Sequence, residues 1–193
     1  KCAARHLVKV YRESYGIFAV HGTLFNHEGT KRGEEFVTRK ITKGVAKIKK
    51  AINNNEPIKP IELGNIYAKR DWSDSEDFIE GIWLMMMQEK PRDYLLASGE
   101  THTIKEFVER AFLAAGIQGN WSEIEDNPLQ TKFYSNSEEA KVLVKINEEF
   151  YRPNEVELLL GDPSRIKLEL GWRPKVSFCN LVKKMVQHDL NEE

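Results

Sequence analysis

The chain has 193 residues, of which 40% are hydrophobic and 31% are charged, and its formal net charge at pH 7 is −1. This length lies between one and two typical domains, and the composition is that of an ordinary globular protein. The balanced charge offers no overall attraction to nucleic acid or to an anionic membrane, so neither is expected as a partner and any anion site must be local.

The cysteines and the apolar runs bear on the compartment. Cys2 and Cys179 match no metal-ligand spacing and no disulfide framework, which favours a reducing, cytosolic setting and predicts no metal site. The longest apolar run is too short to span a bilayer, and no charged-then-apolar leader opens the chain. We therefore expect a cytoplasmic protein without a membrane span.

The first third of the chain alternates helical and extended patterns. Apolar residues at three-to-four spacing predict an amphipathic helix over residues 1–15. The short apolar run 17–20 is typical of a buried parallel strand. A long helix is expected at about 34–52, with two glutamates in its first turn and lysines in its last, which suits the helix dipole. Residues 58–63 predict a strand, in which Pro60 favours an edge position or a bulge.

The middle of the chain begins with a capping box, Ser73-x-x-Glu76, that predicts a helix start. Six apolar residues of this helix are expected to face inward: Phe78, Ile79, Ile82, Trp83, Met85 and Met86. Residues 94–97 predict a strand, and a second capping box starting at Thr103 opens another helix. The polar stretch 117–138 is expected to be an irregular surface loop. Three tryptophans are assigned to packing: Trp72, Trp83 and Trp172.

The last third predicts a strand at 141–146 and two helices, one over 162–171 with an Asp-Pro start and one at about 177–190. Strands alternating with helices of this length indicate an α/β architecture with a largely parallel sheet. Ligands of such sheets bind at the carboxyl ends of strands.

Polar and cationic residues follow the predicted strands. Asn26 and His27 come after the strand at 17–20, and Arg70 lies between a strand and a helix start. An arginine there can donate a charge-assisted fork to a diphosphate near the anion-friendly helix start. Taken singly, such an arginine is more often a surface ion-pair residue, and such an Asn-His pair is as often a plain loop.

Several longer motifs follow one another in order. They are Tyr11-Arg12-Glu13-Ser14-Tyr15-Gly16, Leu24-Phe25-Asn26-His27-Glu28, Arg32-Gly33, Phe36-Val37-Thr38-Arg39-Lys40-Ile41, Leu63-Gly64-Asn65, Ala68-Lys69-Arg70-Asp71-Trp72, Tyr151-Arg152-Pro153-x-Glu155-Val156, Gly161-Asp162, Gly171-Trp172-x-Pro174 and Leu181-Val182-x-x-Met185-Val186. In these motifs, from end to end, the chain resembles the GDP-mannose 4,6-dehydratases, which are extended short-chain dehydrogenase/reductases. The implied reaction is loss of water from GDP-D-mannose, giving GDP-4-dehydro-6-deoxy-D-mannose by an internal redox with NADP, on the way to GDP-fucose and related deoxysugars.

The resemblance also implies which part of such an enzyme this is. Lys1 falls on the lysine of the family's Tyr-x-x-x-Lys motif, where it would bind the nicotinamide ribose and lower the pKa of the tyrosine. The tyrosine, the Ser/Thr and the Glu of catalysis, together with the glycine-rich cofactor loop, would precede Lys1. The 193 residues alone are therefore expected to be inactive. Without the resemblance, Lys1 would be a solvated chain end.

The remaining site residues are also implied by the resemblance. His27 and Arg32 match cofactor-binding positions. The substrate positions are Asn26, Val37, Lys40, Leu63, Gly64, Asn65, Arg70, Arg152 and Glu155. Val37 and Lys40 lie three residues apart and can face one ligand, while Ile41 faces the core. On their own, Lys40 and Glu155 would be solvated surface residues and His27 a loop histidine.

The expected organisation is one C-terminal part of a dehydratase over residues 1–193. Rossmann-type parallel strands and helices would complete the NADP-binding domain, interleaved with a smaller GDP-sugar-binding subdomain at about 26–60 and 100–193. Self-association as a homodimer or homotetramer is implied. The chain has Gly29-Thr30-Lys31 where the family usually has Ser-Pro-Arg. Lysine cannot donate two parallel hydrogen bonds to phosphate as arginine does. The resemblance therefore supports NADP binding and assembly less strongly than it supports the substrate site.

Two alternatives stay open at this point. The chain could be a non-catalytic GDP-sugar-binding or subunit-interaction fragment, or part of another sugar-nucleotide dehydratase or epimerase of the same superfamily. The pairing of Asn-His-Glu with Arg-Pro-x-Glu-Val favours guanosine diphosphate substrates.

Overall fold

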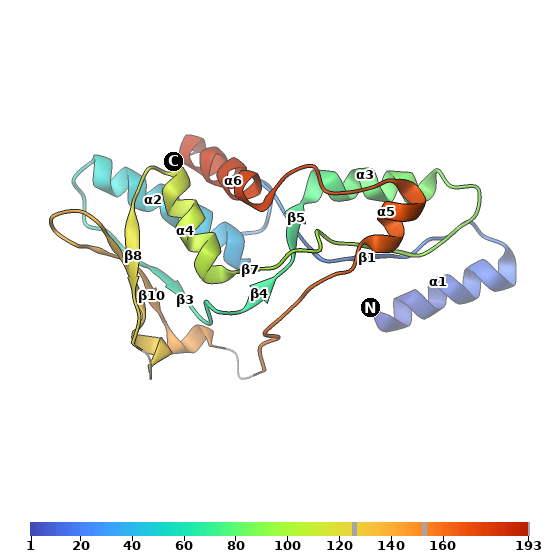
Figure 1. Cartoon of the computed structure of the whole chain (residues 1–193), viewed down its shortest axis with the longest axis horizontal. Coiled ribbons are helices and arrows are strands. Elements are labelled where there is room, and N and C mark those ends of the chain that lie inside the picture. The colour runs from blue at the N-terminus through green and yellow to red at the C-terminus, as the bar shows by residue number, and fades with distance from the viewer. Residues whose placement is uncertain (125–126, 152–153, 193) are drawn as a thin grey trace. The chain divides into compact units, whose positions relative to one another are not determined.

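The computed structural model describes residues 1–124, 127–151 and 154–192 (Figure 1). The chain forms two compact units. Unit 1 consists of residues 1–27, 71–101 and 160–177. Unit 2 consists of residues 28–70, 102–159 and 178–193. Each unit is therefore assembled from three separate stretches of the sequence.

Unit 1 is built around two parallel strands. They are β1 (Gly22–Leu24) and β6 (Tyr94–Leu96), and the helices α3 (Ser75–Met86) and α5 (Ser164–Leu170) both contact β6. A second strand pair joins β2 (Asn26–Glu28) to β5 (Trp72–Asp74), and α1 (Cys2–Tyr15) opens the unit. The core of unit 1 consists of Phe78, Met85, Tyr94, Leu96, Ile166 and Trp172.

Unit 2 combines a mixed four-stranded sheet with three helices. The strand order is β3 (Ile61–Leu63), β10 (Val142–Ile146), β9 (Lys132–Ser135) and β8 (Gly119–Ser122), and the β3–β10 pair is parallel. The helices α2 (Val37–Asn53), α4 (Ile104–Ala114) and α6 (Phe178–Glu192) pack against one another (Figure 1).

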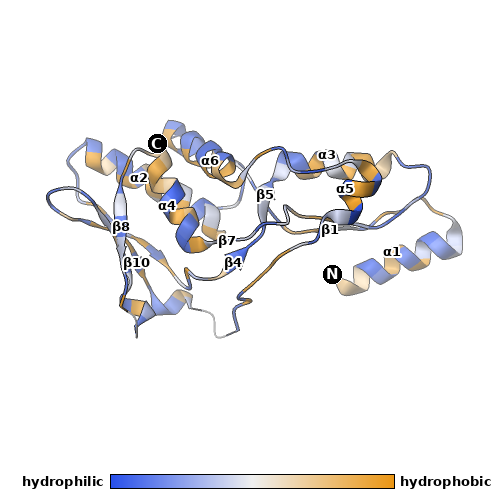
Figure 2. Cartoon of the chain, in the orientation of Figure 1, coloured by the Kyte–Doolittle hydropathy of each residue, from blue (hydrophilic) through white to orange (hydrophobic). Residues whose placement is uncertain are grey.

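Short elements complete unit 2. They are β4 (Lys69–Arg70), β7 (His102–Thr103) and the 3-10 helices η1 (Pro128–Gln130) and η2 (Glu148–Phe150). The hydrophobic and hydrophilic residues alternate along its three long helices, as amphipathic packing requires (Figure 2). The α/β architecture with parallel strands is thus confirmed, although β8, β9 and β10 of the unit 2 sheet pair antiparallel.

Several local predictions are confirmed. α1 ends at Gly16, whose φ of 64° is the left-handed conformation that glycine adopts easily. Thr103 caps α4 by accepting a hydrogen bond from the Glu106 N–H at 3.0 Å. β3 lies at a sheet edge, as Pro60 indicated, and begins directly after that proline. The last helix, α6, lies where its apolar pattern placed it.

The strand predicted at 17–20 was wrong, because the extended pairing begins later, at Gly22. Asp93 fixes this register by accepting a hydrogen bond from the His21 N–H at 3.0 Å, and the Tyr94 N–H then donates to the His21 carbonyl. In this register, the residues opposite 17–20 would come before Tyr94, where β6 begins. Residues 17–20 therefore have no strand to pair with. Ile17 and Phe18 are accordingly exposed rather than buried.

The predicted starts of two helices were also wrong. α2 begins at Val37, so the two glutamates at 34 and 35 lie before its first turn. α3 is capped by Asp74, which accepts a hydrogen bond from the Glu76 N–H at 2.9 Å, and not by Ser73. Ser73 belongs to β5, where its side chain is buried.

The inward face predicted for α3 was only half right. Phe78 and Met85 are buried against β6, whereas Ile79 and Trp83 are 65% and 62% exposed. Ile79 and Trp83 are four residues apart and so form one stripe on the other side of the helix. Trp83 is therefore not a packing residue within unit 1, in contrast to Trp72 and Trp172, which are 3% exposed.

The loop predicted at 117–138 contains two strands, β8 and β9. They form an antiparallel pair in which Trp121 lies directly opposite Phe133, and the two ring centroids are 5.0 Å apart. A cross-strand aromatic pair of this kind stabilises a hairpin whose other residues are polar. The sparse apolar residues hid the strands from a reading of hydrophobic pattern alone.

No helix within the described ranges is both long and apolar enough to cross a membrane. Among the same residues, no group of three or more His, Cys, Asp or Glu side chains could hold a metal ion.

Candidate functional site

The candidate nucleotide site lies in unit 2, where the first turns of α2 meet η2. Lys40 Nζ lies 3.7 Å from the centroid of the Phe150 ring, a cation–π contact. Burial lowers the pKa of Lys40, although the charge of Glu62 opposes the shift. No hydrogen bond from Lys40 to another described side chain satisfies its ammonium. Lys40 is therefore a partly desolvated cation that can accept an anionic ligand.

Glu62, the carboxylate whose charge acts on Lys40, is already paired. Lys145 Nζ lies 2.8 Å from Glu62 Oε1, and Asn147 donates a hydrogen bond to Glu62 at 2.9 Å. The hydrogen bond from Lys145 lowers the pKa of Glu62. Because Lys145 already neutralises Glu62, the charge of Lys40 is available to a ligand.

Gly64 and Asn65 shape the turn after β3. A Cβ at Gly64 would lie 2.2 Å from the Phe150 carbonyl oxygen, so only glycine allows η2 to approach β3 this closely. Asn65 Oδ1 accepts a hydrogen bond from the Tyr67 N–H at 2.9 Å. The side chain of Leu63 is buried. Gly64 therefore allows the close approach of Phe150, which contacts Lys40.

Arg70 and Glu155 meet directly. The Arg70 guanidinium forms an ion pair with Glu155 and donates a hydrogen bond to the Val156 carbonyl. Their side chains are 12% and 23% exposed, so the pair lies at the surface with limited access to water. The sequence assigned separate ligand contacts to these two residues, and the structure brings them into contact with each other. Arg152 lies outside the described residues.

The predicted cofactor residues are divided between the units. In unit 2, Arg32 Nε lies 3.2 Å from the buried carboxylate of Glu28, and its guanidinium lies 3.5 Å from the centroid of the Phe36 ring. The Thr38 hydroxyl also donates a hydrogen bond of 2.6 Å to the Glu28 carboxylate. No described residue accepts a hydrogen bond from the Arg32 Nη nitrogens. Arg32 is thus oriented while its outer edge stays available to an anion.

In unit 1, Asn26 and His27 lie on β2, directly after β1. His27 Nδ1 is 2.9 Å from the Phe25 carbonyl, and its ring centroid is 5.5 Å from that of Phe78. Lys1 is exposed at the start of α1, where its carbonyl accepts a hydrogen bond from the Arg5 N–H.

Two residues that are important for the structure were not singled out by the sequence analysis. Phe150 contacts Lys40, and its position beside the Arg-Pro motif was the available signal. Asp71, inside the Arg-Asp-Trp motif, is fully buried in unit 1. It accepts hydrogen bonds from the Ser98 N–H and Oγ–H, the Gly99 N–H and the Gly161 N–H. Asp71 therefore joins two stretches of unit 1, residues 71–101 and 160–177.

Solved structures share this fold across nearly the whole chain. RMD from Pseudomonas aeruginosa complexed with NADPH matches with a TM-score of 0.75 and 17% identity, covering 99% of this chain and 54% of that one. The dTDP-glucose 4,6-dehydratase from Bacillus anthracis in complex with NAD matches with a TM-score of 0.71 and 16% identity, covering 100% and 51%. The fold is thus that of the extended short-chain dehydratases and epimerases.

The family follows from sequence similarity. The family model described as GDP-mannose 4,6 dehydratase matches residues 1–185. The chain is 46% identical over 187 residues to the GDP-mannose 4,6 dehydratase of Dictyostelium discoideum, covering 95% of this chain and 49% of the relative. It is 41% identical over 190 residues to the Homo sapiens enzyme, covering 98% and 49%. The chain belongs to the GDP-mannose 4,6-dehydratase family, and it spans about half the length of these curated relatives.

Proposed function

We propose that this chain is the substrate-binding half of a GDP-mannose 4,6-dehydratase, a hydro-lyase that converts GDP-D-mannose to GDP-4-dehydro-6-deoxy-D-mannose. The observation that carries the proposal is the 40–46% identity to named GDP-mannose 4,6 dehydratases over almost the whole chain. The product would enter GDP-fucose or related deoxysugar synthesis in the cytoplasm.

Unit 2 would hold the GDP moiety. Lys40 offers a partly desolvated cation for the diphosphate. Arg70 and Arg152 would add forked donors, for which Arg70 would have to loosen its pair with Glu155. Glu155 would then accept from the guanosine or its ribose. Phe150, 46% exposed, offers an aromatic face beside Lys40. Val37, Leu63, Gly64 and Asn65 would line the nucleotide, and Asn26 would bind the hexose or diphosphate.

Unit 1 would complete the cofactor domain, and the cofactor proposed is NADP. In unit 2, Arg32 suits an anionic dinucleotide, because its guanidinium is oriented by Glu28 and Phe36 with its Nη edge unpaired among the described residues. His27 and Lys1 are the further candidate contacts. When bound, the nicotinamide accepts and returns the hydride. In the proposed enzyme Lys1 would hold the ribose and, by its charge, lower the pKa of a tyrosine base.

The resemblance to this family also suggests self-association as a homodimer or homotetramer. Light scattering of the full-length protein, combined with dilution, tests this proposal. A monomer at all concentrations would contradict it.

The activity is tested by incubating the full-length protein with GDP-mannose and NADP and identifying the product by mass spectrometry. A product lighter by one water is expected. A protein that binds GDP-mannose without turnover would instead be the non-catalytic alternative. Turnover of UDP-glucose or dTDP-glucose in preference to GDP-mannose would indicate another sugar-nucleotide enzyme of this fold.

A further inference from the structure

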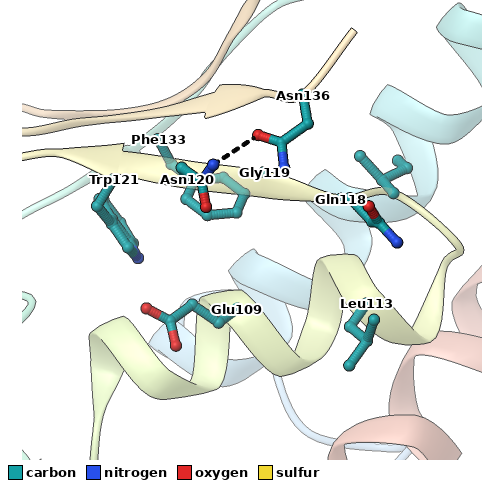
Figure 3. A pocket seen from close by; sticks show the side chains of 9 residues that line it. Glu109, Leu113, Gln118, Gly119, Asn120, Trp121, Phe133 and Asn136 are labelled. Atoms are coloured by element: carbon teal, nitrogen blue, oxygen red, sulfur yellow. Dashed lines mark hydrogen bonds between the residues drawn. The ribbon is translucent and has the colours of Figure 1, made fainter.

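A cleft lies in unit 2, between the edge strand β8 and helix α4 (Figure 3). Its volume is about 650 Å³. β8 occupies one edge of the four-stranded sheet, and β3, which leads into the candidate nucleotide site, occupies the opposite edge. The cleft shares no residue with that site, so the proposed function leaves it unexplained.

The cleft is lined by an apolar floor and a rim of hydrogen-bonding groups. The buried Phe133 and Ile117 supply the floor, and the exposed Leu113 adds an apolar side chain to the lining. The rim carries the amides of Gln118, Asn120 and Asn136, the carboxylate of Glu109 and the indole of Trp121. Asn120 and Asn136 hold each other through a hydrogen bond of 3.0 Å, which fixes two of the three amides.

The decisive group is the indole N–H of Trp121. This nitrogen is buried, yet it has no hydrogen-bond partner among the described residues. In Figure 3 it faces the same space between β8 and α4 as the carboxylate of Glu109. That carboxylate also has no described partner. A buried donor without an acceptor costs free energy, so an oxygen-bearing occupant of this space would be favoured.

The charge in the cleft restricts the occupant. Glu109 is the one charged residue that lines it among the residues described. Lys105 approaches the Trp121 ring to 6.0 Å, but its ammonium lies 2.6 Å from Glu123 and is already paired. A phosphate or carboxylate would meet an unpaired negative charge here. A neutral molecule that carries both hydroxyl donors and acceptors meets matching groups and an aromatic face.

We infer that this cleft is a secondary binding site for a neutral hexopyranose, distinct from the candidate nucleotide site. Trp121 Nε1 donates to a ring or hydroxyl oxygen, Glu109 accepts from one or two hydroxyl groups, and the amides of Asn120 and Asn136 complete the contacts. The apolar face of the sugar lies toward Phe133 and Leu113.

The test is a titration of the full-length protein, with its tryptophan indole nitrogens labelled with ¹⁵N, against D-mannose followed by NMR. A saturable shift of the Trp121 indole signal is expected, and Trp121→Phe identifies that signal by its loss. Trp172 is an internal control, because its indole N–H already donates to the Asp77 carbonyl at 2.9 Å. No saturable shift, or an equal shift of the Trp172 signal, would overturn the proposal.

Matched variants sharpen the test. Glu109→Gln, at an exposed position that leaves the fold intact, is expected to weaken mannose binding about tenfold, because a hydrogen bond to a charged acceptor is lost. Glu139→Gln, an exposed glutamate outside the cleft, should leave binding unchanged. Inorganic phosphate should not shift the Trp121 signal. Saturating GDP should leave the mannose titration unaltered, and its abolition by GDP would assign the effect to the nucleotide site and overturn the inference.

Discussion

Lys40 is the residue on which the proposed nucleotide site depends most. Its ammonium is partly desolvated and in contact with an aromatic ring, and the neighbouring Glu62 is already paired with Lys145. Lys40→Met is expected to weaken GDP binding about tenfold, because a charge-assisted contact to the diphosphate is lost. Lys43→Met is the matched control one turn away, since Lys43 is already paired with Glu34. Calorimetric titration with GDP distinguishes the two variants, and equal affinities would contradict the assignment.

The lowered pKa of Lys40 also predicts a pH dependence. The ammonium must be charged to attract the diphosphate, and burial lowers its pKa below the ordinary 10.5. GDP affinity should therefore fall as pH rises through this lowered pKa, before an ordinary lysine would lose its proton. The fall should be absent in Lys40→Met. A flat profile in the unmodified protein would show that Lys40 does not contact the nucleotide.

Asp71 is expected to matter for stability rather than for binding. Its carboxylate accepts four hydrogen bonds, from Ser98, Gly99 and Gly161 of unit 1. Asp71→Asn replaces one acceptor oxygen by a donor that faces other donors, and should cost roughly 3 kcal/mol of unfolding free energy.

Urea denaturation measures this loss. Asp162→Asn is the matched control, because Asp162 is exposed. Among the described residues, the Ser164 N–H is the one backbone group that donates a hydrogen bond to its carboxylate. The control should cost much less than Asp71→Asn. Equal costs for the two variants would contradict the role given to Asp71.

At the residue scale, motifs predicted a candidate site but not the contacts among its residues. The motif containing Lys40 was correctly assigned to a helix whose neighbour Ile41 faces the core. The contact of Lys40 with Phe150 joins residues far apart in sequence, and periodicity contains no information about such pairs. The ion pair between Arg70 and Glu155 was missed for the same reason.

At the scale of elements, a buried ion pair links α2 to α6. Arg39 Nη2 lies 2.9 Å from Asp189 Oδ1, and their side chains are 6% and 0% exposed. Arg39 also donates to the Thr30 carbonyl, in the loop that precedes Arg32. Burial raises the pKa of Asp189, although Thr42 and Arg39 oppose the shift.

Removing one partner of this ion pair should destabilise the protein more than removing both partners. Asp189→Leu leaves Arg39 buried without its partner and is expected to cost about 3 to 5 kcal/mol, whereas the double variant Arg39→Met/Asp189→Leu should recover much of that loss. A double-mutant cycle in urea measures the coupling. Additive costs would show that the pair does not stabilise the α2–α6 contact.

Glu169 links α5 to β6 and predicts an acid-sensitive step. The Tyr94 hydroxyl donates to Glu169 at 2.7 Å, and with Arg165 and Arg92 it lowers the pKa of Glu169 from 4.5 to about 2. A carboxyl whose folded pKa is lowered stabilises the protein above its ordinary pKa, and this stability is lost as pH falls from 4.5 toward 2. Glu169→Gln should therefore lose less stability than the unmodified protein over this range. Denaturation midpoints against pH compare them, and parallel curves would contradict the linkage.

Helices were more predictable than strands in this chain. Long amphipathic helices such as α4 and α6 repeat their pattern over several turns, so the sequence locates them well. The strands have two to five residues each, and their bounds depend on partners elsewhere in the chain. In β8 and β9, Trp121 lies opposite Phe133, and a local pattern contains no information about such a pairing.

For the whole molecule, the informative feature is apolar surface that remains exposed in unit 1. On α3, Ile79 and Trp83 form an apolar stripe, and on α1, Leu7, Val10 and Tyr11 are each more than half exposed. The chain spans about half the length of its curated relatives. We expect the remainder of a full-length dehydratase to cover these surfaces.

Trp83 reports on this covering. Acrylamide quenching of its fluorescence, taken as the difference between unmodified and Trp83→Phe proteins, should be strong in the 193-residue chain and weak in the full-length protein. Trp72 and Trp172, each 3% exposed, should be weakly quenched in both. Equal quenching of Trp83 in the two proteins would mean that the α3 stripe faces solvent or another partner.

The most direct test of the central claim is the turnover of GDP-mannose by the full-length protein with NADP. We expect conversion to a product lighter by one water. This conversion should be lost or strongly reduced in Lys40→Met at low GDP-mannose concentration and restored toward normal at saturating substrate. No dehydrated product from a folded, cofactor-loaded protein, or equal dehydration of UDP-glucose, would contradict the assignment of this chain as the GDP-sugar-binding half of the enzyme.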